Sequence, residues 1–187
     1  MTILTIVFAL QLNAQKVYQV NNETTIIKWT GKKVAGEHSG KIKVQKGSLA
    51  LKEGKLISGE IFIDMNSITC DDIEDKESNE NLIGHLKNED FFHSSFFPQA
   101  KLKLNKFVKL RNGEYKVIAD LTIKGISKPL VFNSTINQED SKLTANAKII
   151  FDRTLYNIRY GSTLFGAAVD KAIDDNIVLE VHLEAHK

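Results

Sequence analysis

The chain has 187 residues, of which 42% are hydrophobic, with two prolines, a single cysteine and a formal net charge of +2. A chain of this length can bury a sizeable core as one globular domain without disulfides or metals. The charge is too small, and the lysines are too scattered, for a nucleic-acid-binding surface.

The first fifteen residues, MTILTIVFALQLNAQ, carry no charge and contain an apolar run from Ile3 to Leu10. Small Ala14 is suited to the last position before a cleavage site. This pattern predicts a signal peptide over residues 1–15, and therefore an exported, periplasmic protein whose single domain spans residues 16–187. A buried N-terminal strand is the alternative. Signal peptides usually begin with basic residues, so the sequence leaves open whether Met1 is the true start.

From Thr24 onward, apolar and polar residues alternate in the way that half-buried strands require. The clearest runs are GEIFIDMNSI at 59–68, YKVIADLTIKG at 115–125, KLTANAKIIF at 142–151 and NIVLEVHLEA at 176–185, with shorter ones such as TIIKWTG, GKIKVQKG and QAKLKLNKF elsewhere. Asn112-Gly113 is a strong hairpin signal. At least eight strands with almost no crossover helix predict an all-β fold, in which an antiparallel sheet closes or folds on itself.

One helix is predicted, over Asn79 to Glu89, and two Phe pairs follow it, Phe91-Phe92 and Phe96-Phe97. Four aromatic rings at a helix-to-strand junction are more apolar surface than a turn needs, which raises the question of what they cover. An eight-stranded barrel either packs solid or holds one small ligand. Strand faces that are otherwise aliphatic carry three small residues, namely Ala119, Ala145 and Ala147. These residues would leave room inside the barrel, although alanines also allow tight packing.

Signatures of catalysis and metal binding are absent from the sequence. It contains no His-Glu-x-x-His pair, no Gly-x-Ser-x-Gly elbow, no phosphate-binding loop and no cysteine–histidine spacing for zinc, and its five histidines are dispersed. Cys70 reads as a small side chain at a strand end rather than a nucleophile. We therefore expect no catalytic residues, no metal site and no cofactor.

Six motifs follow one another along the chain. They are WTGKKVAGEHSG at 29–40, GEIFIDMNSI at 59–68, LIGHLKNEDFF at 82–92, FPQAKLKL at 97–104, ADLTIKGISKPL at 119–130 and FDRTLYNIRYGS at 151–162. Any one of them is weak. The ordered series, which covers roughly Thr24 to Ala185, resembles the YceI-like family of secreted bacterial polyisoprenoid-binding proteins.

The resemblance implies an extended, lipocalin-like, eight-stranded antiparallel β-barrel with one short helix, a covering loop and an apolar cavity. It implies a periplasmic carrier, without catalytic residues, for a polyisoprenoid, a quinone or a similar long-chain amphiphilic lipid. The helix and its Phe-rich exit would cover one part of the barrel, and the loop at 161–166 is a candidate flap over another. The residues expected at the cavity lining or mouth are Phe91, Phe92, Phe96, Phe97, Ala119, Leu121, Ala145, Ala147, Ile149, Leu164 and Phe165.

Two other functions stay open. An enzyme, a hydrolase or isomerase in the same barrel, would use His38, His93 or Asp152, and two of these would have to meet inside the cavity. A solid-core module for a protein partner would show a filled interior and an exposed apolar patch. Arg153 and Arg159 are expected to form salt bridges or to donate to a polar ligand head. The N-terminal apolar run is too short to span a bilayer, and homodimerisation is left open.

Overall fold

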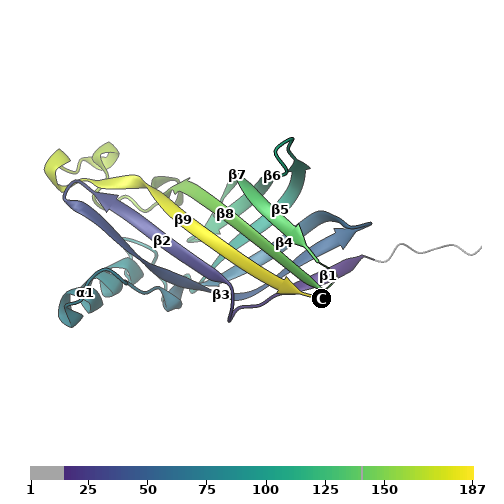
Figure 1. Ribbon diagram of the computed structural model, residues 1–187. Coiled ribbons are helices and arrows are strands. Elements are labelled where there is room, and N and C mark those ends of the chain that lie inside the picture. The colour runs from purple at the N-terminus through teal and green to yellow at the C-terminus, as the bar shows by residue number, and fades with distance from the viewer. Residues whose placement is uncertain (1–14, 140) are drawn as a thin grey trace, which may run out of the picture.

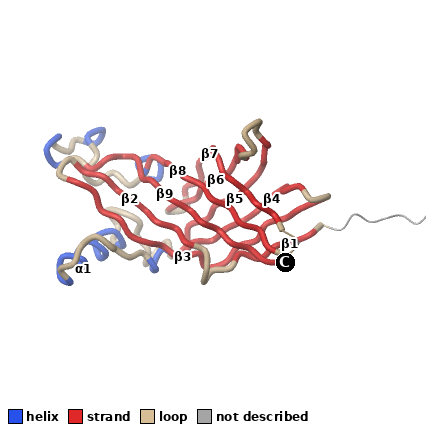
Figure 2. The backbone as a smooth tube through the Cα atoms, viewed as in Figure 1, coloured by secondary structure: helices blue, strands red, loops and turns tan. Residues whose placement is uncertain are grey.

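The computed structural model describes residues 15–139 and 141–187, so the predicted signal peptide lies outside the described residues except for Gln15. The described chain is mostly strand, with one α-helix and short 3₁₀ helices (Figures 1 and 2). The strands are β1 (Lys16–Val20), β2 (Ile26–Lys33), β3 (Gly36–Lys52), β4 (Lys55–Asp64), β5 (Gln99–Lys109), β6 (Tyr115–Ile123), β7 (Ile126–Gln138), β8 (Lys142–Asp152) and β9 (Ile173–His186). The helices are η1 (Met65–Ser67), α1 (Lys76–Lys87), η2 (Arg153–Tyr156), η3 (Thr163–Phe165) and η4 (Val169–Lys171).

The strands form one antiparallel sheet in the order β1-β3-β2-β9-β8-β7-β6-β5-β4, and the pairing of β3 with β4 closes it. β2 pairs with the first part of β3, from Gly36 to Ile42, whereas β1 pairs with the last part, from Ser48 to Leu51. Both also pair with β9. β1 and β2 therefore share one position, and the strands make a closed eight-stranded barrel. The predicted antiparallel barrel is confirmed.

The interior is lined by the strand faces that the alternation indicated. In β6 every second residue is buried and the residues between them are at least partly exposed. Because successive side chains of a strand point to opposite faces, one face of each strand meets the core and the other meets solvent. The buried positions of β6 are Val117, Ala119, Leu121 and Ile123.

Helix α1 occupies residues 76–87, whereas the sequence predicted 79–89. Asp75 caps it, because its carboxylate accepts a hydrogen bond of 2.8 Å from the backbone N–H of Ser78. A second cap shortens a predicted strand. Asp64 is the last residue of β4, and its carboxylate accepts a hydrogen bond from the backbone N–H of Asn66. This cap starts η1 at Met65, whereas the alternation in the sequence had predicted that the strand continues.

The two ends of the barrel differ in what covers them (Figure 1). At one end, here called the capped end, lie α1, the connection at 88–98 and the segment 153–172 with η2, η3 and η4. At the other, here called the strand-sealed end, lie β1 and the C-terminus. Within the described residues, no helix combines the length and the apolar character needed to cross a bilayer.

Candidate functional site

Two apolar cavities lie inside the barrel. The first has a volume of about 150 Å³, lies toward the capped end and is walled in part by Trp29 and Leu86. The second has a volume of about 80 Å³, lies toward the strand-sealed end and is walled in part by Leu143 and Leu183. Because they share lining residues, the cavities are neighbouring compartments of the barrel interior, and we call the two together the tunnel. Four residues line both of them: Ile27, Ile63, Leu121 and Leu179.

Several of the predicted site residues line this tunnel. Phe91, Phe92 and Leu121 line the first cavity, and Leu121, Ala145, Ala147 and Ile149 line the second. Ala119 is 1% exposed and packs in the core without lining either cavity. The small side chains of two alanines thus face open space, as room for a ligand requires. Their contact with a ligand stays a prediction.

The remaining predicted residues line neither cavity. Phe96 is 71% exposed and lies edge-on to Phe97, with ring centroids 4.8 Å apart. Leu164 is 73% exposed. The guanidinium of Arg159 lies over the ring of Phe165, 4.5 Å from its centroid. These side chains belong to the surface of the capped end, and a role for them at the mouth stays a prediction.

The wall of the tunnel reaches the surface at the hairpin between β2 and β3, and we call this place the tunnel opening. Among the described residues that line the two cavities, only Lys32 and Lys33 are exposed. Beside them the pairing of β2 with β9 is irregular: Gly31 pairs with Ile177 and Lys33 with Ile173, so β9 bulges. A bulge interrupts the ladder and bends the strand. The seam between β2 and β9 is therefore interrupted where the tunnel opens.

Helix α1 and the connection after it cover the first cavity. Leu86 of α1 and Phe91 beyond it both line that cavity. The ring of Phe91 lies edge-on to His85, with centroids 4.8 Å apart, and 5.5 Å from the ring of Tyr160. His85 also meets Tyr160 edge-on at 4.6 Å. Three rings thus join α1, its connection and the segment 153–172, and of the two Phe pairs only the first lines the tunnel.

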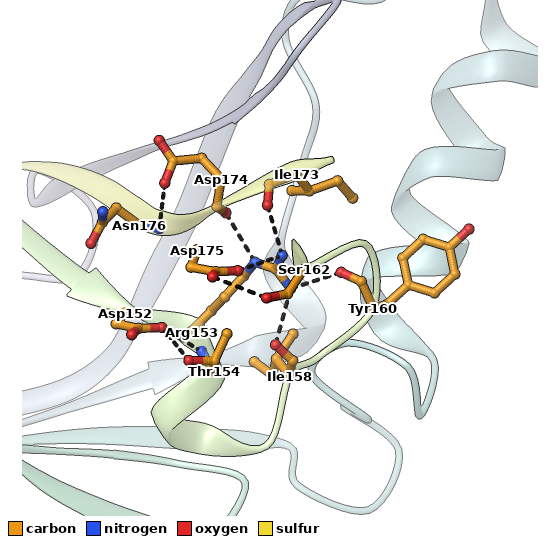
Figure 3. A network of polar contacts seen from close by, with 10 residues as sticks. All are labelled: Asp152, Arg153, Thr154, Ile158, Tyr160, Ser162, Ile173, Asp174, Asp175 and Asn176. Carbon is orange, nitrogen blue, oxygen red and sulfur yellow. Dashed lines mark hydrogen bonds and ion pairs between the residues drawn. The ribbon is translucent and has the colours of Figure 1, made fainter. Parts of the chain in front are cut away.

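Arg153, 1% exposed, begins the segment 153–172 and forms part of the wall of the first cavity. Its five N–H groups are all used (Figure 3). Nε donates to the backbone oxygen of Asp174 (3.0 Å), Nη1 to those of Ile158 (3.0 Å) and Tyr160 (2.8 Å), and Nη2 to that of Ile173 (3.1 Å) and to Oδ1 of Asp175 (3.1 Å). Burial lowers the pKa of Arg153, and the charge of Asp175 opposes that shift. The expected salt bridge is confirmed, and this guanidinium has no donor left for a ligand head.

The same contacts anchor the segment 153–172 on the barrel. The hydroxyl of Ser162 donates to Oδ2 of Asp175 at 3.0 Å, and the N–H of Ile173 donates to the backbone oxygen of Gly161 at 2.8 Å. Carbonyl groups in irregular backbone lack sheet partners and still require donors when they are buried. The planar fork of a guanidinium can supply several donors at once. The covering loop is therefore held from its inner side by polar contacts.

Residues 67–72 run beside β3 and support the first cavity from outside. Nε1 of Trp29 donates to the backbone oxygen of Thr69 at 2.9 Å, and the N–H of Thr69 donates to that of Lys41 at 2.9 Å. Gly40 permits this approach, because a Cβ at that position would lie 1.9 Å from the Thr69 oxygen. Trp29 is the chain's single tryptophan. Since it also lines the first cavity, its fluorescence can report on what enters.

The three residues of the enzyme alternative have separate surroundings. Nδ1 of His38 lies 2.8 Å from Oδ2 of Asp72, and His38 lines the first cavity. His93 packs against the rings of the second Phe pair. Asp152 accepts from the N–H and the hydroxyl of Thr154 at 2.8 and 2.6 Å and starts η2. Each of the three thus has a local structural partner.

Asp72 also accepts from the backbone N–H of Ser39 at 2.7 Å and from the thiol of Cys70 at 3.3 Å. Desolvation raises the pKa of Asp72, but the hydrogen bonds from Ser39 and His38 outweigh it and the pKa is lowered. Burial raises the pKa of the Cys70 thiol, which disfavours a reactive thiolate. In the part of the chain that the structure describes, no His, Cys, Asp and Glu side chains gather as a metal site.

Sequence reasoning missed Trp29, Lys32 and Lys33 as wall residues and did not assign Arg153 to the wall. The alternation in TIIKWTG puts Ile27 and Trp29 on one face, so this signal was present. For the two lysines no such signal exists, because lysine at a strand end usually indicates a solvated position.

A family model described as the YceI-like domain matches residues 18–185. UPF0312 protein plu2095 of Photorhabdus laumondii is 34% identical over 55 residues, a stretch that spans 29% of this chain and 28% of that protein. BcnA of Burkholderia cenocepacia has a similar structure, with a TM-score of 0.68, 20% identity and coverage of 88% of this chain and 98% of BcnA. A polyisoprenoid binding domain from Saccharophagus degradans gives a TM-score of 0.62, 12% identity and coverage of 90% and 97%. At these identities the structural likenesses establish the shared fold.

Proposed function

The chain belongs to the YceI-like domain family, and from that premise we propose that it is a periplasmic carrier that holds a polyisoprenoid, a quinone or a similar long-chain amphiphilic lipid in its barrel. The main support is the tunnel, whose wall is almost wholly hydrocarbon and whose exposed wall residues are two lysines. The Saccharophagus degradans domain with the same fold is described as polyisoprenoid-binding. The apolar, uncharged start of the chain supports export.

The tunnel is long and narrow. Its wall residues on β9 run from Ile173 to Leu183. With a rise of about 3.3 Å per residue and a strand tilt of about 40°, this span corresponds to roughly 25 Å along the barrel axis. The two cavity volumes together correspond to roughly fifteen water-sized positions. A chain that occupies both cavities would have to pass the residues that line both of them, and we expect those side chains to change rotamer when it binds.

Burial of the chain supplies the affinity. Each methylene removed from water contributes roughly 0.8 kcal/mol, so ten of them contribute on the order of 8 kcal/mol before costs. Association and ordering of a flexible chain remove several kcal/mol of this. Because few hydrogen bonds are needed, selection among head groups would be loose.

Native mass spectrometry of protein purified from the periplasm, followed by organic extraction, tests this proposal. A stoichiometric apolar chain compound is expected and would name the ligand class. Protein stripped of ligand should also change its Trp29 emission on addition of polyprenyl chains, with affinity rising with length until the tunnel is full. A protein that emerges empty and whose Trp29 responds to neither polyprenyl chains nor quinones would overturn the proposal.

Ala147→Phe makes the test specific to the tunnel, because it puts a ring into the second cavity. The ring would take up much of this cavity of about 80 Å³, so room for several methylenes would be lost, and the binding of long chains should weaken at least tenfold while short chains are unaffected. Ile150→Phe is the matched control, since it adds a ring to the outer face of the same strand, where Ile150 is 52% exposed. Equal losses in both variants would contradict a ligand in the tunnel.

A further inference from the structure

Exposed apolar side chains gather on the loops around the tunnel opening. Val34, at the tip of the β2–β3 hairpin, is 64% exposed, Leu164 in η3 is 73% exposed and Val169 at the start of η4 is 76% exposed. The N–H of Val34 donates to the backbone oxygen of Ala172 at 3.2 Å, so the hairpin tip and the residues after η4 lie side by side at the capped end (Figure 1). We call Val34, Leu164 and Val169 the apolar tips.

The apolar tips stand next to the opening. Val34 directly follows Lys32 and Lys33, the exposed residues of the tunnel wall. Ala172, the partner of Val34, directly precedes Ile173, which also lines the first cavity. The way from the surface into the tunnel therefore runs beside the apolar tips.

Long cationic side chains are interleaved with the apolar tips. They are the exposed residues Lys32, Lys33, Arg159 and Lys171. Three carboxylates lie among them: Glu37, Asp170 and Asp174. Lysine and arginine stems lie along apolar surface while their charged ends reach lipid phosphates, and aliphatic residues flanked in this way suit the interfacial region of a bilayer. Exposed apolar residues that gather on one surface are a feature of sites that bind a partner or a membrane.

Two of the three apolar tips, Leu164 and Val169, lie on the segment 153–172, which is anchored to the barrel, and Val34 lies on the β2–β3 hairpin. Arg153 and Asp175 hold the segment 153–172 from its inner side, and Tyr160 packs against α1. A surface that is ordered before it binds loses little conformational entropy when it docks. The apolar tips can therefore bind one partner together, although they lie on two different parts of the chain.

We propose that the capped end docks on the surface of a phospholipid bilayer, with the apolar tips inserted among the lipid headgroups and the tunnel opening facing the membrane. Docking in this orientation lets an apolar chain pass between bilayer and tunnel without exposing its methylenes to bulk water. The inference deepens the proposed function and rests on it, because the lipid that would be exchanged is the proposed ligand.

Co-sedimentation with vesicles of phosphatidylethanolamine and phosphatidylglycerol tests the docking. The full chain should bind, and the triple variant Val34→Ser, Leu164→Ser, Val169→Ser should bind about tenfold less tightly or worse, because three apolar side chains no longer leave water. The matched control is Val131→Ser with Ile150→Ser, since both residues are about half exposed on the barrel wall, at 53% and 52%. An environment-sensitive dye on Leu164→Cys should report an apolar setting on vesicles, whereas the same dye on Val131→Cys should not.

Uptake of a polyprenyl chain from detergent micelles, followed by Trp29 emission, separates this inference from the function on which it rests. Loss of vesicle binding in the tip variant with unchanged uptake from micelles supports the docking. Failure of the full chain to bind vesicles, or an equal loss in the wall variant, overturns the docking and leaves lipid binding standing. Absence of any Trp29 response to the micellar chain would overturn the proposed function itself.

Discussion

The two ends of the barrel are closed by different kinds of structure. At the strand-sealed end, regular strands close the interior with their own side chains, and Leu143 and Ala185 there are 0% exposed. At the capped end, irregular segments close it, and they require a buried guanidinium whose five donors satisfy backbone oxygens and one carboxylate. The difference arises because strand carbonyls already have partners in the ladder, whereas those of an irregular cap do not.

Among the residues that the structure describes, exposed wall residues lie at the capped end alone, and they are Lys32 and Lys33. At the strand-sealed end, a ligand could enter only if paired strands separated, which costs ladder hydrogen bonds. At the capped end, the closing loops can move apart at a lower cost in free energy. The comparison predicts that the two ends respond differently to matched substitutions, and that exchange of a ligand takes place at the capped end.

Arg153→Met tests the capped end most severely. The variant should lose about 3–5 kcal/mol of unfolding free energy, because Asp175 is left as a half-buried carboxylate without its cationic partner and four backbone oxygens lose a donor. Urea unfolding followed by circular dichroism measures this loss. Arg159→Met is the control, since that guanidinium lies over the ring of Phe165, and it should cost less than about 1 kcal/mol. Similar losses in the two variants would contradict the anchoring role of Arg153.

The same substitution at the two ends sharpens the contrast. Leu143→Ala should cost about 3 kcal/mol, because Leu143 is 0% exposed and its removal enlarges a cavity that strands enclose. Leu164→Ala should change the unfolding free energy by less than about 0.5 kcal/mol, because that side chain is 73% exposed. Thermal melts of the pair provide the comparison, and a large loss from Leu164→Ala would mean that it packs inward.

A glycine pair tests how closely residues 67–72 approach β3. Gly40→Ala should cost roughly 2–3 kcal/mol, because the new Cβ would lie 1.9 Å from the backbone oxygen of Thr69 and force residues 67–72 away from β3. It should also alter Trp29 emission, since Trp29 donates to that oxygen. Gly84→Ala, in α1 with open space around it, should instead raise the unfolding free energy by about 0.5–1 kcal/mol. A neutral Gly40→Ala would disprove the tight contact.

The smallest effect is expected at the strand-sealed end, from Glu184. Hydrogen bonds from Lys142, 2.9 Å away, and from Thr24 lower the pKa of Glu184 to about 2. A carboxylate with a depressed folded pKa stabilises the fold above its unfolded value of about 4.5, and this contribution disappears as the pH falls toward about 2. Glu184→Gln should thus be less stable than the wild type at about pH 7 and equal to it near pH 2. A difference that persists in acid would rule out this linkage.

The alternation of residues predicted the inward faces correctly where the backbone is regular. Leu121, Ala145, Ala147 and Ile149 line the tunnel because a period of two is a local property of any extended strand. The Phe-rich connection has no such period. The sequence could therefore not tell that Phe91 would line the tunnel and Phe96 would be 71% exposed.

Arg153 shows the same limit of prediction from sequence. Its sequence neighbours allowed either a salt bridge or a donor to a ligand head, and the choice depended on where residues up to 22 positions away bring their oxygen atoms. The sequence by itself determined an antiparallel β-fold with apolar inner faces, since strand geometry follows from local sterics and patterning. Only the tertiary structure decided how the barrel ends are closed and where the tunnel opens, because those features come from contacts between segments far apart in the chain.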